Sequence, residues 1–142
     1  MSGDTYLLDV NVLVALTNPH LGRYAYVQRW FSCVDSWATT PVTENGLFRL
    51  TINPTISGSR LSAADVTALL AAVRAWPGHV FLPDDTSLAD PVIDLTGVVG
   101  HRQVTDAHLV NLAARHGVVL ATLDASIEQM LVPKDRRWVH LV

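Results

Sequence analysis

The stretch "LLDVNVLVAL", residues 7–16, carries a single carboxylate, Asp9, with apolar residues on both sides. Burying an unpaired charge costs several kcal/mol, so an aspartate inside a core strand is unfavourable unless something compensates its charge. The pattern predicts a short buried strand over residues 5–9 and a helix from Asn11 to Thr17. Asp9 is therefore expected where the strand ends and the chain turns, so that its carboxylate need not be buried.

Short apolar strands alternate with amphipathic helices along the rest of the chain. Further strands are expected at residues 36–40, 79–83, 118–122 and 137–142. Further helices are expected at residues 21–34, 41–53, 63–76, 105–117 and 124–131. Residues 54–60 are expected to form a polar loop, and residues 84–100 a loop with one small helix. This alternation is typical of an α/β sandwich with a mainly parallel central sheet.

The composition indicates one globular domain over residues 1–142, because 49% of the residues are hydrophobic and only 16% are charged. No apolar segment approaches the length of about 20 residues that spans a bilayer, and the N-terminus is acidic where a signal peptide is basic. We therefore expect a cytoplasmic protein that does not contact the membrane. The single cysteine, Cys33, is expected to be a small packed residue.

Four acidic residues lie at or near the expected starts of helices. Asp9 and Asp124 each follow an apolar strand, whereas Glu44 and Asp106 lie in first turns, on faces that carry apolar residues. Helix capping explains each acid singly, since a cap contributes about 0.5–2 kcal/mol without any chemistry. In a parallel sheet, however, ligands bind in the crevice beyond the carboxyl ends of the strands, and we expect the four carboxylates to meet there.

Carboxylates gathered in one crevice repel one another, by roughly 4 kcal/mol for a pair about 4 Å apart at an effective dielectric near 20. A divalent cation or protonation must relieve this repulsion, and a site made only of oxygen ligands suits Mg²⁺ or Mn²⁺. Zinc is disfavoured because the six histidines show no paired spacing and only one cysteine is present. His108 and His116 are expected on the exposed side of their helix.

Four stretches carry a resemblance to a known family: "LLDVNVLVAL", "TTPVTENGLFRL", "VTDAHLVNLAARHG" and "VLATLDASI". In order and separation they resemble the motifs of PIN-domain ribonucleases, specifically the toxins of VapBC-type toxin–antitoxin pairs. The resemblance spans nearly the whole chain. It implies a PIN-like three-layer sandwich with a parallel sheet of about five strands and helices on both faces. It also implies a homodimer and a small antitoxin protein whose C-terminal segment occupies the RNA groove.

The resemblance further implies a divalent-metal-dependent endoribonuclease. Its catalytic acids would be Asp9, Glu44, Asp106 and Asp124. Asp9 and Asp106 would hold the Mg²⁺ or Mn²⁺ ion, a second ion could lie near Asp124, and Asn11 and Thr122 match polar positions that support the acids. If a water attacks the phosphodiester, cleavage leaves 5′-phosphate and 3′-hydroxyl ends and does not require the ribose 2′-hydroxyl.

Arginine dominates the cationic side chains, with only one lysine in a chain of net charge −3. Arginine forms bidentate contacts with phosphate, although a genomic bias toward arginine codons explains the same composition. Four arginines lie near the acidic motifs or on the second expected helix and are candidate RNA contacts: Arg23, Arg29, Arg49 and Arg102. The alternative is that each is an ordinary solvated surface residue. Tyr24, Tyr26 and Trp30 are candidates for base stacking, and the spacing of Trp30 is also that of a core residue.

Two other classes of function stay open at this point. A phosphotransfer α/β domain also has an aspartate after its first strand. The haloacid-dehalogenase type needs a second aspartate where this chain has Asn11, and the receiver type needs a late lysine, whereas Lys134 follows Pro133 in an expected loop. A non-catalytic PIN-like module would only bind RNA or protein, and such modules usually lack one or more of the acids that are all present here. Mg²⁺-dependent cleavage of RNA distinguishes these classes.

Overall fold

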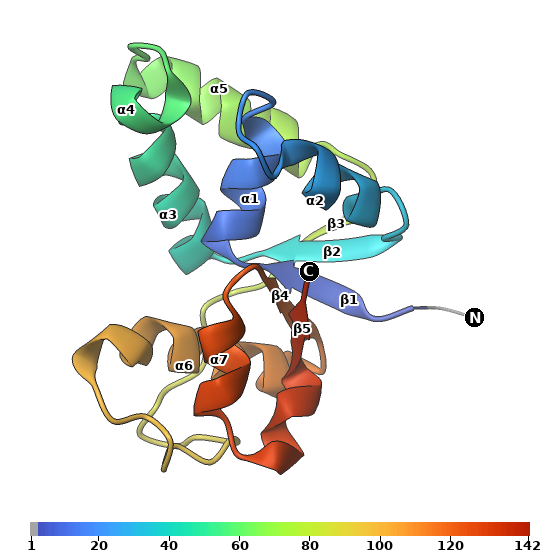
Figure 1. Ribbon diagram of the computed structural model, residues 1–142, viewed down its shortest axis with the longest axis vertical. Helices are drawn as coiled ribbons and strands as arrows, with labels where there is room; N and C mark the ends of the chain where they lie inside the picture. The colour runs from blue at the N-terminus through green and yellow to red at the C-terminus, as the bar shows by residue number, and fades with distance from the viewer. Residues whose placement is uncertain (1–2) are drawn as a thin grey trace.

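The computed structural model describes residues 3–142 and contains one five-stranded sheet (Figure 1). The strands are Thr5–Leu8 (β1), Ser36–Thr39 (β2), His79–Phe81 (β3), Val119–Thr122 (β4) and Val139–Leu141 (β5). They lie in the order β3-β2-β1-β4-β5, and all four pairings are parallel. The expected parallel α/β architecture is therefore confirmed.

Helices cover both faces of the sheet, as expected. One group comprises Val10–Thr17 (α1), Tyr24–Phe31 (α2), Pro41–Thr51 (α3), Pro54–Ser57 (α4) and Ala63–Arg74 (α5). The other comprises Val104–His116 (α6) and Ala125–Met130 (α7), with the 3₁₀ helices His101–Gln103 (η1) and Pro133–Trp138 (η2). In Figure 1 the first group lies above the sheet and the second below it. Among residues 3–142, no helix combines the length and apolar character needed to cross a bilayer.

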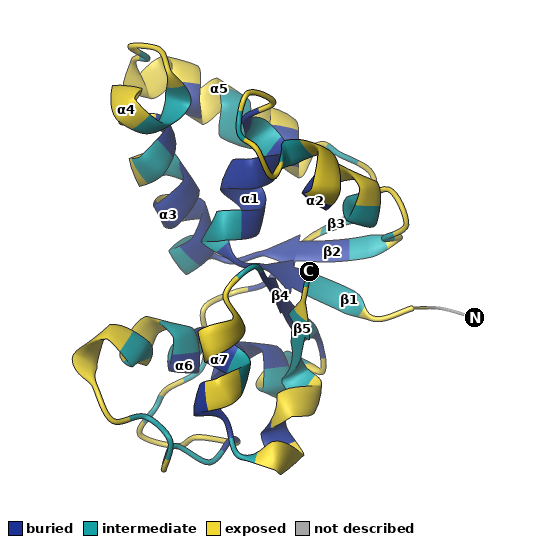
Figure 2. Cartoon of the chain, in the orientation of Figure 1, coloured by how far each residue is buried: buried dark blue, intermediate teal, exposed yellow. Residues whose placement is uncertain are grey.

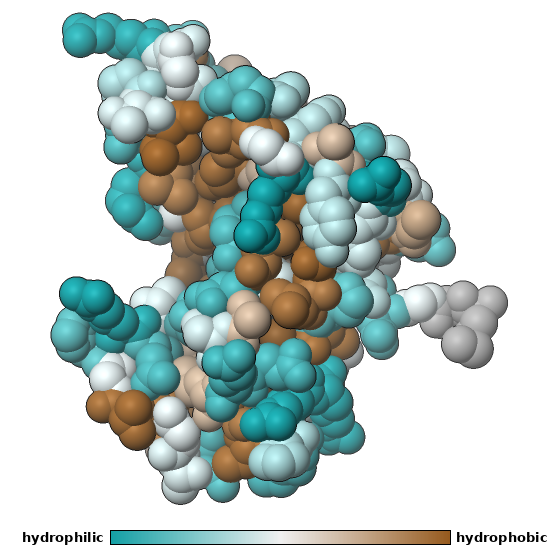
Figure 3. All heavy atoms as spheres, viewed as in Figure 1, coloured by the Kyte–Doolittle hydropathy of each residue, from teal (hydrophilic) through white to brown (hydrophobic). Residues whose placement is uncertain are grey.

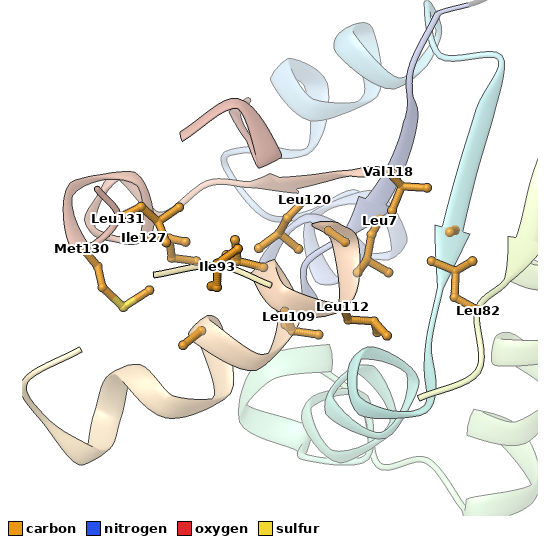
Figure 4. Packing of buried hydrophobic residues seen from close by; sticks show 14 residues of the cluster. Leu7, Leu82, Ile93, Leu109, Leu112, Val118, Leu120, Ile127, Met130 and Leu131 are labelled. Carbon is orange, nitrogen blue, oxygen red and sulfur yellow. The ribbon is translucent and has the colours of Figure 1, made fainter. Parts of the chain in front are cut away.

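Each face of the sheet has its own hydrophobic cluster. Leu8, Leu13 and Trp37 pack with α1, α2, α3 and α5 on one face. Leu7, Leu109 and Leu120 pack with α6 and α7 on the other, as Figure 4 shows. Neighbouring residues of β1 thus point to opposite faces, as the two-residue period of a strand requires. Figure 2 shows the resulting pattern, with buried residues on the strands and on the inward sides of the helices.

The strand order places a switch point between β1 and β4. From β1 the chain proceeds outward through β2 to β3, and it returns to β4 and β5 on the other side. In open α/β sheets, ligands bind beyond the carboxyl ends of the strands at such a point. Asp9 directly follows β1, and Asp124 follows β4 after a single intervening residue. The fold therefore brings these two aspartates to the edge where a site is expected.

Three local predictions were wrong. Residues 54–57 form the short helix α4 rather than a loop, because Asn53 caps it by accepting a hydrogen bond from the Thr55 N–H. Residues 84–100 contain turns but no helix, and the short helix η1 begins only at His101. Cys33 is exposed rather than packed, because α2 ends at Phe31 and the cysteine lies beyond its apolar face.

Candidate active site

Asp9 is 7% exposed and directly follows β1 as the N-cap of α1. Its Oδ1 accepts a hydrogen bond from the Val10 N–H at 2.7 Å, and its Oδ2 accepts one from the Thr122 hydroxyl at 2.7 Å. Burial raises the pKa of Asp9, the two hydrogen bonds lower it, and the charge of Asp124 raises it further. The aspartate is thus more buried than the sequence predicts, and polar partners from the start of α1 and the end of β4 compensate its charge.

Thr122 and Asn11 join the ends of β1 and β4. The Thr122 hydroxyl donates its proton to Asp9 and accepts hydrogen bonds from the Asp124 N–H at 3.1 Å and from Asn11 Nδ2 at 3.3 Å. Asn11 Oδ1 in turn accepts from the Leu123 N–H at 3.1 Å. Both residues therefore connect the segment that carries Asp9 to the segment that carries Asp124.

Asp124 and Asp106 approach Asp9 from two other helices. Asp124 is the exposed N-cap of α7, and its Oδ1 accepts from both the N–H and the hydroxyl of Ser126, at 2.9 and 2.7 Å. Asp106 is half-buried in the first turn of α6. Burial, followed by the negative charges of Asp9 and Asp124, raises the pKa of Asp106 to about 6. The three carboxylates are thus close enough to repel one another.

The three aspartates line one pocket of about 750 Å³, which we call the main pocket. Its remaining wall is largely apolar and is formed in part by Val14, Leu21, Leu50 and Ile56. Figure 3 shows the hydrophobic atoms of this upper group of helices beside the indentation that separates it from the lower group. Asp9 and Asp106 also line a second hollow of about 500 Å³, together with Asn45, Arg49 and Thr105. No pattern in the sequence indicates the apolar wall, because its residues come from three separate helices and the segment between α1 and α2.

Glu44 does not join the three aspartates. It is 8% exposed, its Oε2 accepts a hydrogen bond from the Thr39 hydroxyl at 2.6 Å, and it pairs with Arg74 Nε at 3.6 Å. His79 Nε2 lies 2.7 Å from the same hydroxyl, and because the only hydroxyl proton goes to Glu44, His79 is the donor there. The expectation of a single pocket for four acids therefore holds for three of them.

The rotation of α3 explains where Glu44 lies. Val42, Asn45 and Arg49 line the second hollow and form one stripe of the helix, and Glu44 projects from the opposite side. Close packing fixes this rotation, since a Cβ at Gly46 would lie 2.5 Å from Val10 Cγ2. Leu47 and Thr51 lie on the same side of α3 as Glu44, and this side faces the core between α3 and α5 rather than the acids. Glu44 therefore points inward, as predicted, but toward this core and not toward the three aspartates.

Only two of the four candidate arginines lie at the acids. Arg23 lines the main pocket and Arg49 the second hollow. Arg29 and Arg102 are exposed and line neither.

The candidate aromatic residues also differ from one another. Trp30 stacks on His140, with ring centroids 5.7 Å apart, and meets Tyr6 edge-on, so it belongs to the packed structure. Tyr26 is 52% exposed.

Two histidines of α6 are paired rather than free on an exposed face. His108 Nε2 lies 2.6 Å from Asp84 Oδ1, and His116 Nε2 lies 2.7 Å from Asp85 Oδ1. Both ring systems are partly buried, because residues 84–85 of the preceding loop cover them. Sequence spacing could not reveal these pairs, since each partner lies more than 20 residues away in a loop without periodic structure.

Comparison with known proteins supplies the family. No family model matches the chain. The chain is 44% identical to ribonuclease VapC38 of Mycobacterium tuberculosis over 138 residues, which cover 96% of both proteins. It is 45% identical to ribonuclease VapC39 of the same species over 126 residues, 87% of this chain and 91% of that one. The crystal structure of M. tuberculosis VapC20, a sarcin–ricin loop cleaving toxin, has the same fold, with a TM-score of 0.61 over 90% of this chain and 97% of that one at 14% identity. The chain therefore belongs to the VapC family of ribonucleases.

Proposed function

We propose that this VapC-family ribonuclease is the toxin of a toxin–antitoxin pair and hydrolyses RNA with a divalent cation held by Asp9 and Asp106. The observation that carries the proposal is the shared main pocket of Asp9, Asp106 and Asp124, in which burial and then the charges of Asp9 and Asp124 raise the pKa of Asp106. Such a group of like charges is unfavourable unless a cation or protons compensate it. Near neutral pH, where free protons are scarce, a cation is the better compensation.

The donor set fits Mg²⁺ or Mn²⁺. Among residues 3–142, no three His, Cys, Asp or Glu side chains converge closely enough to hold an ion on their own. Mg²⁺ does not need such a cage, because it keeps several waters and uses one or two carboxylates together with substrate phosphate oxygens. Asp9 and Asp106, which line both hollows, are the two carboxylates that we assign to the ion.

The protein's own residues then orient the reaction. When bound, the cation supplies Lewis acidity toward a water and the phosphodiester. Thr122 and the Val10 N–H fix the two oxygens of Asp9, which keeps that carboxylate aimed at one position. Ser126 occupies Oδ1 of Asp124, so Oδ2 is the oxygen that can orient a water and take its proton. The water oxygen bonds to phosphorus, the P–O3′ bond breaks, and the leaving oxygen is protonated from solvent.

We assign Glu44 a positioning role rather than a place in the reacting centre. Its contacts with Thr39 and Arg74 tie α3 to β2 and α5. Because α3 also carries Asn45 and Arg49 into the second hollow, this anchoring acts on the site indirectly. Arg23 and Arg49, at the two hollows, are the arginines that we propose as RNA contacts.

We further propose that the protein works in the cytoplasm, as a homodimer, and that a small antitoxin protein inhibits it. Membership of the VapC family supports the antitoxin partner. Expression of the chain should arrest growth, and co-expression of the small reading frame beside its gene should relieve the arrest. Sedimentation of the purified chain tests the dimer. Growth arrest that persists in an Asp9→Asn variant would count against a toxic effect through RNA hydrolysis.

Cleavage of RNA by the purified chain is the direct test. We expect cleavage with Mg²⁺ or Mn²⁺, none with EDTA, and loss of activity in Asp9→Asn and Asp106→Asn. Asp35→Asn is the matched control, because Asp35 is an exposed aspartate just before β2, at the opposite end of the strands. Full activity of Asp9→Asn, or cleavage that continues in EDTA, would refute the proposal.

A further inference from the structure

The proposed reaction raises the question of how RNA is distinguished from DNA. A water attacks the phosphodiester, so the ribose 2′-hydroxyl has no chemical part in the step. Specificity for RNA must then come from binding, and a polar group has to contact that hydroxyl, because it is the feature by which proteins tell the two nucleic acids apart at a given site. This inference rests on the proposed function and asks which residue makes the contact.

Another hollow lies beside the acids, around the start of α6. The second hollow, which contains Asp9 and Asp106, shares Val42 and Thr105 with a third hollow of about 470 Å³. The third hollow, here called the side groove, is lined by Val42, Asp84, Thr86, Val104, Thr105 and His108, among others. Val42 and Thr105 therefore separate two adjacent hollows, and a nucleotide whose phosphate lies at the acids has the side groove next to it, on the other side of Thr105.

A fixed imidazole lies in this groove. His108 Nε2 is 2.6 Å from Asp84 Oδ1, and the two side chains are 19% and 32% exposed. Since a carboxylate accepts the hydrogen bond, Nε2 carries a proton and Nδ1 is the remaining polar atom of the ring. Val104, Thr105 and His108 are neighbours around the first turns of α6, so the imidazole lies next to Thr105 rather than on a separate surface.

The chemistry of the side groove suits a sugar better than a phosphate. Its polar groups are hydroxyls and the His108–Asp84 pair, which carries no net positive charge in either state of the histidine. An anion would meet the Asp84 carboxylate without a compensating cation, whereas a ribose offers neutral donors and acceptors.

We propose that the side groove binds the ribose of a nucleotide next to the scissile phosphate, and that His108, oriented by Asp84, contacts its 2′-hydroxyl. His108 is then the residue that makes the enzyme specific for RNA. It takes no part in the chemical step, and its removal affects the choice of sugar rather than the reaction itself.

The chain contains a matched control for this assignment. His116, on the same helix, pairs with Asp85 at 2.7 Å, so the two histidines make the same contact with the same loop. His116 lines neither of the hollows that contain the acids, nor the side groove. Removing it should loosen the loop to a comparable degree without touching the bound nucleotide.

The test compares sugars at single positions. A pool of short random single-stranded RNAs, cleaved with Mg²⁺ and sequenced at the new ends, first supplies a preferred oligonucleotide. This oligonucleotide is then made with ribose throughout and with one 2′-deoxy sugar on either side of the cleaved bond. We expect one of the two substitutions to lower kcat/KM of the wild type roughly tenfold, the loss of about one hydrogen bond.

The variants decide the assignment. His108→Ala should cleave the ribose and the 2′-deoxy substrates at similar rates, Asp84→Asn should weaken the discrimination, and His116→Ala should retain it. Circular dichroism and thermal melting confirm that each variant is folded. Discrimination that survives in His108→Ala, or that is absent from the wild type at both positions, overturns the inference but leaves the proposed function intact. A wild type that cleaves no RNA with either cation overturns both.

Discussion

Thr122 donates a hydrogen bond of 2.7 Å to Asp9 Oδ2, although the two residues are 113 positions apart in the chain. The contact joins the carboxyl ends of β1 and β4, the neighbouring strands at which the order of the strands in the sheet reverses. A buried carboxylate stays charged only if such partners compensate its desolvation. The Thr122 hydroxyl therefore links the topology of the sheet to the electrostatics of the pocket.

Thr122→Val, which keeps the shape and removes the hydroxyl, should destabilise the protein by about 1–3 kcal/mol, because it leaves Asp9 with one donor fewer. The pKa of Asp9 should rise further, since this hydrogen bond lowers it. Urea unfolding measures the loss of stability. Thr51→Val is the control, because the Thr51 hydroxyl is also buried but has no partner among residues 3–142, so its removal should be neutral or stabilising. Equal losses in both variants would contradict the role of the Thr122 hydrogen bond.

The pKa of Asp106 predicts how the metal-free protein responds to pH. Its pKa is raised to about 6 by burial and by Asp9 and Asp124, so below this pH the folded protein binds a proton that the unfolded chain releases near pH 4. This contribution to stability is complete below about pH 4 and is lost as the pH rises through about 6. Thermal melting in EDTA should show Asp106→Asn equal to the wild type at low pH and more stable at neutral pH. Mg²⁺ should stabilise only the wild type, and a variant that is less stable than the wild type in EDTA at neutral pH would contradict this.

Glu44→Gln should reduce stability by about 1–3 kcal/mol, because the Thr39 hydroxyl loses a charged acceptor, whereas the half-exposed Arg74 adds little. Metal affinity should change little, in contrast to a loss of at least about 10–100-fold in Asp106→Asn. Calorimetric titration with Mg²⁺ or Mn²⁺ separates the two effects. If Glu44→Gln loses metal binding as completely as Asp106→Asn, Glu44 belongs to the centre after all.

Gly46→Ala should destabilise the protein by about 1–3 kcal/mol, since the new Cβ would lie 2.5 Å from Val10 Cγ2 and Val10 is a stiff β-branched residue beside Asp9. Gly22→Ala is its control, because a Cβ there meets nothing within 4 Å. Thermal melting of both variants checks the prediction. A Gly46→Ala protein as stable as Gly22→Ala would show that α3 is not held against α1 in this way.

The positions of three aspartates could be predicted from the sequence because each depends on local signals. Asp9 and Asp124 follow apolar strands, and Asp106 opens a helix closed by Gly117, so parallel topology alone brings them to one edge. Glu44 required more, since its direction depends on the rotation of α3, which the contact between Gly46 and Val10 sets. A short helix can carry apolar residues on more than one side. The sequence pattern alone therefore does not indicate which neighbouring element an inward-pointing residue of α3 contacts.

The surroundings of the acids were not predictable for a related reason. The main pocket combines residues of α1, α3, α4 and α6 with residues of the segments before α2 and before α7. The pairs of Asp84 with His108 and of Asp85 with His116 join a loop to α6. The residues that make these contacts are not spaced with a helical or strand period, so no pattern in the sequence predicts the contacts. Cys33 shows the same limit, since its exposure follows from where α2 ends.

A titration of the metal-free protein with Mn²⁺, followed by electron paramagnetic resonance, tests directly whether Asp9 and Asp106 hold the cation. We expect the wild type to bind Mn²⁺ and Mg²⁺ to displace it. Asp9→Asn and Asp106→Asn should lose this binding together with RNA cleavage, whereas Asp35→Asn should keep both. Unchanged Mn²⁺ binding in the Asp9 and Asp106 variants would show that the cation lies elsewhere, and the assignment of the centre would be wrong.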